Sequence, residues 1–376
     1  MKFYIFLIFI IFKISDAFAI DTKAEQAIVI DNSTNEIIFE KNSDERMSPA
    51  SMTKIMTIYI VFDRLINTNL TLDDTCRISP KAYKMQGSRT FIEIDTNVSI
   101  HDLIKGVIIQ SGNDASVAIA ECLSGTEKDF SKLMNVYAKD LGLINSNFTN
   151  SSGWPEDNHY STVKDIAILS FHLIKNFPDL YVFFKEKEFT YNNIKQPNRN
   201  KLLDNVFGVD GLKTGYVKKS GFGISASSIR DDRRITVVIH GTNSSRSRLN
   251  ESANLINWAY EQTIQKKILN KNQVIKNVDV WLGNKPNINL IIENDVFSTL
   301  SYDQLKTIKS TLHYEKPISA PFNKGDKLGE IVISIDGKPD ITVPLLAETK
   351  VNPVNPFFRL IAAIKYIIFG NSLDEI

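Results

Sequence analysis

The sequence predicts an α+β fold that is followed by a small all-β domain. Strand-like runs lie at residues 27–39 and 206–240, on both sides of a helical middle. Strands that flank helices in this way are typical of an antiparallel sheet packed with helices. From about residue 270 the pattern changes to short alternating strands. The 376 residues, 43% hydrophobic and 23% charged, have the composition of a globular protein with two or three folding units.

The elements of the first domain follow one another in a simple order. A β-hairpin is expected first, because two apolar runs flank a polar Ser-Thr-Asn turn. A helix then begins at Ser48-Pro49, since proline favours the first helical position. The predicted elements are strands 27–31 and 37–39, helices 48–66, 101–110, 114–123, 127–141 and 162–175, strands 206–214, 222–228 and 234–240, and a helix over 246–266.

The second domain is expected over residues 270–350. Val278 to Leu282 alternates as a strand, and Asp336-Gly337 separates two further strand-like runs as a hairpin turn does. With the first domain at 20–266, the chain is thus expected to have two structured domains, preceded by an N-terminal segment and followed by a C-terminal segment of other kinds.

The N-terminal end has the features of a secretory signal. Lys2 precedes an unbroken apolar run from Phe3 to Phe12, and Ala17-Phe18-Ala19 follows as a small-x-small cleavage site. Ten residues are too few to cross a hydrocarbon core, which needs about 20. We therefore predict a signal peptide at 1–19, export, and a mature chain that begins near Ile20. The alternative is an uncleaved N-terminal anchor.

The C-terminal end, residues 353–376, reads as a linker and a helix. Asn355-Pro356 favours a helix start, and the stretch from Phe357 to Phe369 carries only Arg359 and Lys365 as charges. Thirteen helical residues span about 20 Å, too short for a bilayer. One basic face on an otherwise apolar helix suits the headgroup region of a membrane. We expect an amphipathic membrane-surface helix. The alternative is a terminal helix packed on its own domain.

Composition argues against several classes of function. With 44 Lys+Arg and 43 Asp+Glu, the net charge of +1 lacks the basic excess of nucleic-acid-binding proteins. Five histidines without an HExxH or CxxC motif indicate no zinc site.

The two cysteines permit at most one disulfide. Cys122 is expected as a buried thiol in an apolar helix and Cys76 as unpaired, with a Cys76–Cys122 bridge as the alternative.

A candidate nucleophile lies in the first turns of the helix that Pro49 opens. Ser51 and Lys54 are three residues apart, which places the hydroxyl and the amine on one helical face. A serine hydroxyl becomes a good nucleophile when a neighbouring base takes its proton. Lysine can be that base if burial and another cation favour its neutral form. A second Ser-x-x-Lys, at Ser161, reads as a capped helix start.

Two further triplets complete the pattern. Ser111-Gly112-Asn113 interrupts two apolar helices, so that a hydroxyl and an amide project from a turn. Lys213-Thr214-Gly215 follows a strand-like run, and its glycine lets a ligand lie close along the strand. Ser-x-x-Lys, Ser-x-Asn and Lys-Thr-Gly in this order are a signature of β-lactamases and penicillin-binding proteins.

The longer motifs resemble one branch of these proteins. They are Ser48-Pro-Ala-Ser-Met-Thr-Lys-Ile-Met-Thr57, Ile109-Gln-Ser-Gly-Asn-Asp-Ala115 and Asp210-Gly-Leu-Lys-Thr-Gly-Tyr216, supported by Gln196-Pro-Asn-Arg-Asn200. They are similar to the low-molecular-mass penicillin-binding proteins, the serine D-alanyl-D-alanine carboxypeptidases. The resemblance covers about residues 25–265 and, more loosely, the β-rich domain and the tail. It implies a DD-peptidase/β-lactamase-like transpeptidase fold.

The resemblance also implies a reaction and three catalytic residues. Ser51 would attack the carbonyl between the terminal D-alanines of a peptidoglycan stem peptide, Lys54 would take its proton, and Ser111 would relay a proton to the departing D-alanine. No metal or organic cofactor is required, and β-lactams would be trapped as acyl-enzymes.

The remaining implied roles concern substrate binding. Asn113 would hold the peptide backbone, Lys213 and Thr214 would bind the terminal carboxylate with help from Arg199, and the N–H groups of Ser51 and Tyr216 would form the oxyanion hole. The substrate-binding set is therefore Asn113, Lys213, Thr214, Gly215, Tyr216 and Arg199. Val217 and Ser152-Gly153-Trp154 depart from the family pattern, so the cleft edge is expected to differ.

Three other functions compete with the carboxypeptidase. A DD-endopeptidase of the same fold would cut cross-links in place of terminal D-alanine. A catalytically inactive cell-wall binding protein would keep the fold alone, but the intact Ser51 and Lys54 argue against it. A β-lactamase is disfavoured because no clearly placed glutamate would drive rapid deacylation.

Overall fold

The computed structural model describes residues 20–357, 360–361 and 364. Within it the chain divides into two compact units, one formed by residues 20–30 and 39–258, the other by residues 31–38 and the described residues from 259 onward. The predicted signal peptide at 1–19 and most of the predicted C-terminal helix lie outside the described residues. In the described part of the chain no helix is long and apolar enough to cross a membrane.

A five-stranded sheet forms the centre of the first unit, and its strand order is β2-β1-β9-β8-β7. The predicted hairpin and the three later strands are all present. β7 is an edge strand, which pairs antiparallel with β8 along its whole length. The strands are β1 (Gln26–Asp31), β2 (Glu36–Lys41), β7 (Val209–Val217), β8 (Gly221–Arg230) and β9 (Arg233–Thr242).

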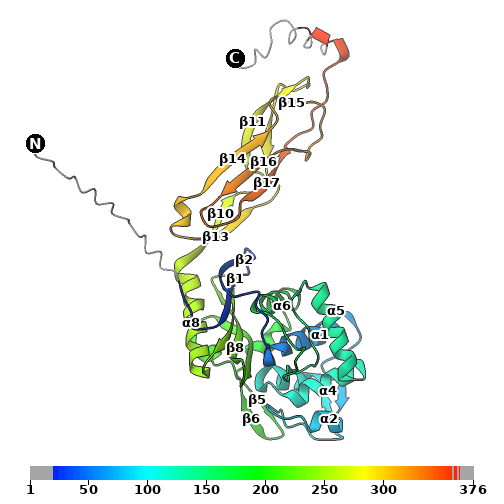
Figure 1. The fold of residues 1–376 in the computed structure, drawn as a ribbon. Helices are drawn as coiled ribbons and strands as arrows, with labels where there is room; N and C mark the ends of the chain where they lie inside the picture. Colours follow the sequence, from blue (N-terminus) through cyan, green and yellow to red (C-terminus); the bar gives the residue numbers. More distant parts are fainter. Residues whose placement is uncertain (1–19, 358–359, 362–363, 365–376) are drawn as a thin grey trace, which may run out of the picture. The chain divides into compact units, whose positions relative to one another are not determined.

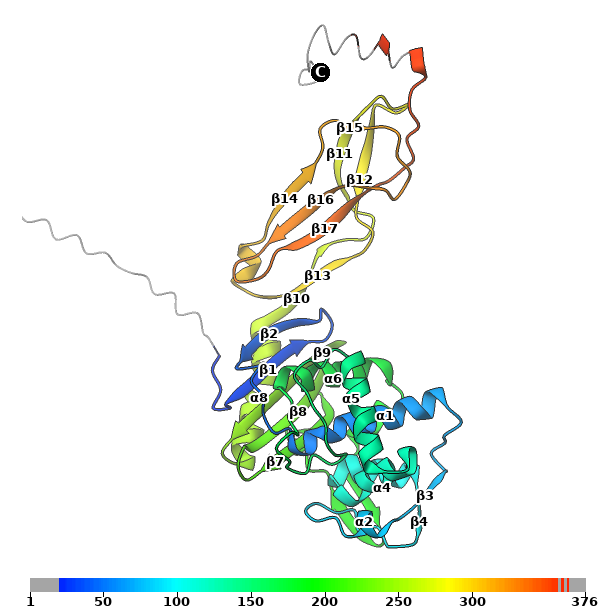
Figure 2. The same cartoon turned by 45° about the vertical axis from the view of Figure 1, so that its right-hand side comes forward.

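Helices cover both faces of this sheet, with α8 on one face and α1, α6 and their neighbours on the other (Figures 1 and 2). Thr126 and Thr162 cap α5 and α6 by accepting hydrogen bonds from N–H groups in the first turn. The helices and helical turns are η1 (Ala50–Thr53), α1 (Lys54–Asn67), α2 (Pro80–Tyr83), α3 (Ile100–Lys105), η2 (Gly106–Gln110), α4 (Asn113–Ser124), α5 (Glu127–Asp140), α6 (Val163–Asn176), η3 (Tyr181–Lys185), α7 (Leu202–Asn205) and α8 (Ser245–Gln262).

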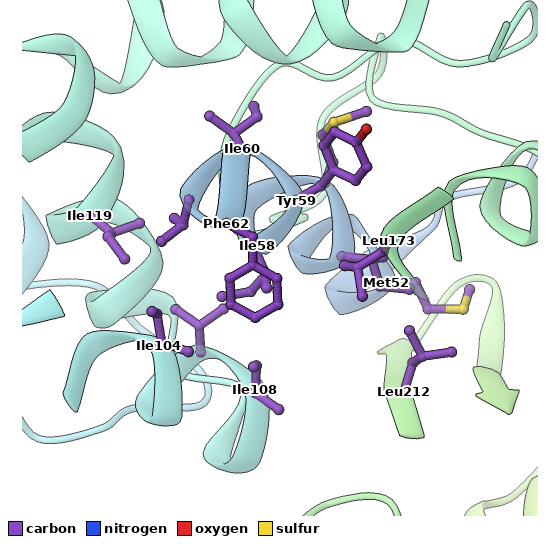
Figure 3. Packing of buried hydrophobic residues seen from close by; sticks show 14 of the residues in the cluster. Met52, Ile58, Tyr59, Ile60, Phe62, Ile104, Ile108, Ile119, Leu173 and Leu212 are labelled. Atoms are coloured by element: carbon purple, nitrogen blue, oxygen red, sulfur yellow. The ribbon is translucent and has the colours of Figure 1, made fainter. Parts of the chain in front are cut away.

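Helix α1 runs through the middle of the hydrophobic core. Every residue from Lys54 to Phe62 is buried, so the first half of the helix is packed on all sides. Figure 3 shows Phe62 among Ile104 and Ile108, with Met52 near Leu212 of β7 at the other end of the helix. A helix packed on all sides has little freedom to shift, which makes it a rigid support for side chains at its N-terminus.

Several boundaries differ from those expected. The long final helix ends at Gln262, and residues 263–269 form a strand, β10, in place of its predicted last turn. The strand expected at 206–214 begins at Val209 and extends to Val217. Two short two-stranded sheets were not predicted. β3 (Thr75–Arg77) pairs with β4 (Asn97–Ser99) across a connection that contains α2, and β5 (Glu188–Tyr191) forms a hairpin with β6 (Ile194–Pro197).

The two cysteines form a disulfide, which corrects the expectation of two free thiols. Cys76 in β3 and Cys122 in α4 have Cα atoms 5.6 Å apart, although 46 residues separate them. The sequence indicated only the apolar helix around Cys122. The packing of the unpredicted strand β3 against that helix brings the second sulfur within bonding distance.

The second unit is built almost entirely of strands, as predicted. The predicted hairpin at Asp336-Gly337 joins β16 to β17, and Gly337 has the positive φ, 74°, that such a turn favours. A two-stranded sheet contains β10 (Thr263–Leu269) and β13 (Val296–Ser301). A six-stranded sheet contains β14 (Lys309–Tyr314), β16 (Lys327–Ser334), β17 (Ile341–Ala347), β12 (Asn287–Ile291), β11 (Val274–Trp281) and β15 (Ile318–Ser319), with a helical turn η4 (Gln304–Lys306) before β14.

Candidate active site

Ser51 and Lys54 lie where a short 3-10 turn becomes the central helix. Ser51 is in η1 and Lys54 is the first residue of α1, so the predicted single helix begins with a tighter turn. The amine Nζ of Lys54 is 3.0 Å from the Ser51 hydroxyl oxygen. Sequence spacing therefore predicted this contact correctly, because residues three apart share a face in both kinds of helix.

Lys54 is completely buried and has two other hydrogen-bond partners. Its Nζ donates to Asn113 Oδ1 at 2.8 Å and to the carbonyl oxygen of Ser152 at 2.6 Å. Burial lowers the pKa of Lys54 to about 7, against the opposing negative charges of Asp114 and Glu127. A neutral lysine amine has two hydrogens and one lone pair. With its hydrogens directed to Asn113 and Ser152, the lone pair is left for the Ser51 hydroxyl.

Ser111 lies at the break between two helical segments, as predicted. Its φ of 66° is left-handed, an uncommon conformation for a residue other than glycine. This reversal ends η2 and allows α4 to begin at Asn113, so both side chains face the same cleft. Asn113 is held from its other end, because its Nδ2 donates to the carbonyl of Gln86 at 2.7 Å.

Lys213 and Thr214 lie within edge strand β7, as in the predicted strand over 206–214. Lys213 is buried, and the pKa of its amine is well below its usual range, first because of burial and then because Lys54, Arg248 and Arg199 are also positive. The repulsion between the two lysines thus adds to the shift at Lys213, whereas burial lowers the pKa of Lys54. The second cation that the sequence predicts is thus present, but burial is what lowers the pKa of Lys54.

Gly215 has a packing role that the sequence did not reveal. A Cβ added there would lie 2.9 Å from the Pro49 carbonyl oxygen, closer than real Cβ atoms approach. The absence of a side chain therefore lets β7 lie directly against the turn that carries Ser51. This close approach brings the Lys-Thr-Gly strand and the Ser-x-x-Lys turn to one site.

A cleft of about 820 Å³ joins these elements. Two predicted residues, Lys54 and Lys213, are buried behind its surface. The half-exposed Tyr216 stacks on Phe222 with ring centres 4.2 Å apart, forming an aromatic wall. The predicted residues that line the cleft are Ser51, Ser111, Asn113, Thr214, Gly215, Tyr216 and Arg199.

Arg248 of α8 is a cleft residue that the sequence did not single out. Its guanidinium donates to the Gly215 carbonyl at 3.4 Å and lies over the Phe222 ring. Burial lowers the pKa of Arg248 to about 10, so the group stays positively charged at neutral pH. Arg248 could not be identified as a cleft residue from the sequence, because its position in the cleft depends on which turn of the polar helix α8 faces β7.

The Ser152-Gly153-Trp154 segment lines one edge of the cleft, where a departure from the family pattern was expected. Gly153 has a φ of 77°, and a Cβ there would lie 1.8 Å from the Ala50 carbonyl oxygen. Glycine is therefore required for this loop to lie against η1 and to direct the Ser152 carbonyl at Lys54. Within the described residues, no group of three or more His, Cys, Asp or Glu side chains could hold a metal ion.

Two family models match the chain in succession. Residues 13–244 match the D-alanyl-D-alanine carboxypeptidase family, Peptidase_S11, and residues 264–353 match the C-terminal domain of penicillin-binding protein 5. The two matches correspond to the helix-and-sheet part of the chain and to the β-rich part that follows it.

Known proteins are similar over most of their length. The chain is 36% identical to the D-alanyl-D-alanine carboxypeptidase DacC of Escherichia coli K12 over 341 residues, 89% of this chain and 85% of that protein. It is 33% identical to DacF of Bacillus subtilis, which covers 87% of this chain and 85% of that protein. The crystal structure of penicillin-binding protein 5 from Haemophilus influenzae superimposes with a TM-score of 0.77 at 35% identity, covering 88% of this chain and 98% of that one. The chain therefore belongs to the D-alanyl-D-alanine carboxypeptidase family, Peptidase_S11.

Proposed function

We propose that this protein is a serine-type D-Ala-D-Ala carboxypeptidase that removes the terminal D-alanine of peptidoglycan stem peptides and is acylated by penicillins. The observation that carries the proposal is the meeting of three separate segments at one cleft. Ser51 and Lys54 come from η1 and α1, Ser111 and Asn113 from the break before α4, and Lys213 from β7. Family membership supports the same reaction.

The first step forms an acyl-ester. The neutral amine of Lys54 accepts the proton of the Ser51 hydroxyl while Oγ attacks the carbonyl carbon between the two D-alanines. Negative charge then develops on the carbonyl oxygen, where the backbone N–H groups of Ser51 and Tyr216 stabilise it. Ser111 passes a proton to the departing amine, so that the C–N bond breaks and free D-alanine leaves. Water hydrolyses the ester afterwards.

The substrate carboxylate binds among the cations at the end of β7. Lys213 and Thr214 supply an ammonium and a hydroxyl, and Arg199 adds charge from the opposite loop. Because burial and neighbouring cations disfavour the charged form of Lys213, an incoming carboxylate favours its protonation. Peptides without a free C-terminal carboxylate lack this gain, so the proposed enzyme should prefer the end of a peptide.

We extend the proposal to the location of the enzyme. Residues 1–19 serve as a signal peptide, 20–266 as the catalytic domain, 270–350 as the β-rich domain, and 353–376 as a linker with a helix that attaches to the periplasmic membrane surface. The Cys76–Cys122 disulfide supports export, since disulfides persist in oxidising compartments. The exposed side chains of Phe357, Leu360 and Ile364 support contact with lipid over packing on the domain.

The test is release of D-alanine from a D-Ala-D-Ala pentapeptide by the mature protein and by Ser51→Ala. We expect release by the wild type and none by the variant, which should keep the wild-type melting temperature. Mass spectrometry after penicillin treatment should show a chain that begins near Ile20 and carries one acyl group on Ser51.

The competing functions give different results in the same assays. A binding protein would release no D-alanine and take up no penicillin. An endopeptidase would cleave cross-linked muropeptides faster than the pentapeptide. A β-lactamase would turn over penicillin within seconds in place of remaining acylated.

A further inference from the structure

The proposed mechanism makes no use of the buried carboxylate of Glu127, which acts electrostatically on Lys54. Glu127 is the first residue of α5, its side chain is 9% exposed, and it lies outside the cleft lining. Its Oε1 accepts two hydrogen bonds from Ser151, one from the backbone N–H at 3.1 Å and one from the hydroxyl at 2.7 Å. Buried carboxylates are costly unless they are satisfied in this way.

Glu127 is connected to Lys54 through the residue that follows Ser151 in the chain. The residue after Ser151 is Ser152, whose carbonyl accepts from Lys54 Nζ at 2.6 Å. From the other side, the hydroxyl of Thr57 on α1 donates to the Ser151 carbonyl at 2.6 Å. The segment that presents an acceptor to the general base is thus held between α5 and α1.

We infer that Glu127 is a positioning residue for the proposed reaction. Glu127 directs the Ser152 carbonyl at the amine of Lys54, and its negative charge helps to set the protonation of that amine. The inference rests on the proposed function. With the Ser152 carbonyl fixed, one hydrogen of neutral Lys54 is directed away from Ser51, and the lone pair is kept in line with the Ser51 proton.

Charged and titratable groups face Lys54 from several elements. Asp114 of α4 and Glu127 favour the protonated amine, and Lys213 of β7 and the loop residue His159 also interact with it electrostatically. Burial lowers the pKa of His159 to about 4, so this imidazole is neutral in the working pH range. Both carboxylates have a cation nearby: Arg89 Nε lies 3.9 Å from Asp114 Oδ2, and Lys81 Nζ of α2 lies 2.7 Å from Glu127 Oε2. The Lys81 side chain is 55% exposed and lies outside the cleft lining.

The pair provides two variants with opposite expected effects. Glu127→Gln removes a negative charge and keeps an acceptor oxygen for Ser151, so Lys54 should lose its proton more readily. In a plot of the penicillin acylation rate against pH, the acidic limb, where the rate falls as the pH is lowered, should then shift to lower pH by roughly half a pH unit. Lys81→Met leaves Glu127 without its counter-ion, so the limb should move up by a similar amount. Lys128→Met, at the next position of α5, is the matched control and should not move it.

The experiment is the second-order rate constant for acylation by a fluorescent penicillin from about pH 5 to pH 9. Opposite shifts in the two variants support the inference. The inference is overturned if both variants change the acylation rate by the same factor at every pH and the acidic limb stays at its wild-type pH. A purely structural role of Glu127 predicts that outcome. If Glu127→Gln does not fold, the upward shift in Lys81→Met decides. A wild-type protein that takes up no penicillin at any pH would instead overturn the proposed function itself.

Discussion

At the scale of single residues, the reactivity of this site comes from burial. Lys54 is enclosed completely, and its amine is left with three polar neighbours, Ser51, Asn113 and the Ser152 carbonyl. An exposed lysine has a pKa near 10.4 and would be protonated at neutral pH. Enclosure in the core brings the pKa of Lys54 to about 7, as its proposed role of general base requires.

The pH dependence of acylation should follow from this value. Protonated Lys54 cannot accept the Ser51 proton, so the rate is low below the pKa, rises with pH through about 7, and levels off above it. One unit below the pKa only about a tenth of the amine is neutral, and the rate should fall to roughly a tenth of its plateau. Stopped-flow acylation across pH measures this. A rate that stays constant down to about pH 5 would contradict a lysine base.

Arg248 gives a second prediction at this scale. Arg248→Gln removes a charge and the hydrogen bond to the Gly215 carbonyl, both next to the proposed carboxylate site. Charge-assisted hydrogen bonds contribute about 1.5–3 kcal/mol, so kcat/KM for the pentapeptide should fall by about 10- to 100-fold, mainly through KM. Arg246→Gln, on the same helix but exposed and outside the cleft lining, is the control and should leave both constants unchanged. Equal effects of the two changes would refute a specific role for Arg248.

At the scale of elements, the site depends on breaks in regular structure. Ser111 in a left-handed conformation ends η2, η1 precedes α1 as a 3-10 turn, and Gly153 turns its loop against that turn. Rigid elements on either side hold these irregular segments. Such an arrangement is typical of sites that need fixed side-chain directions.

The disulfide is an element-scale feature with a measurable contribution. It links β3 to α4, the helix that begins with Asn113, and closes a separation of 46 residues. Replacing both cysteines by serine should lower the free energy of unfolding by about 2–4 kcal/mol, measured by urea denaturation. The wild type under reducing conditions should behave in the same way. An unfolding midpoint that does not change in either case would show that the bridge is not stabilising.

At the scale of the whole molecule, the tail is expected to decide where the enzyme works. Removal of residues 356–376 should abolish sedimentation with vesicles that contain anionic lipid and leave penicillin acylation unchanged, because the tail contributes no cleft residue in the described structure. Neutral phosphatidylcholine vesicles should bind the full-length protein more weakly. Equal sedimentation of the full-length and shortened proteins would contradict a membrane role for the tail.

The sequence by itself determined the fold class, the order of the main elements and the residues of the three motifs. These are local properties, since alternating and helical patterns, proline starts and the spacing of Ser51 and Lys54 are all read from neighbours in the chain. Motif resemblance then joined the three segments into one proposed site.

Only the tertiary structure decided what touches these residues. The Ser152 carbonyl and Arg248 reach the site from a loop and a helix that are far from the motifs in sequence, Glu127 contacts the neighbouring Ser151, and the Cys76–Cys122 bridge depends on a three-residue strand. Burial of Lys54, and with it the shift of its pKa, also arises from packing by several elements at once. Contacts between distant segments depend on three-dimensional packing, which no local pattern records.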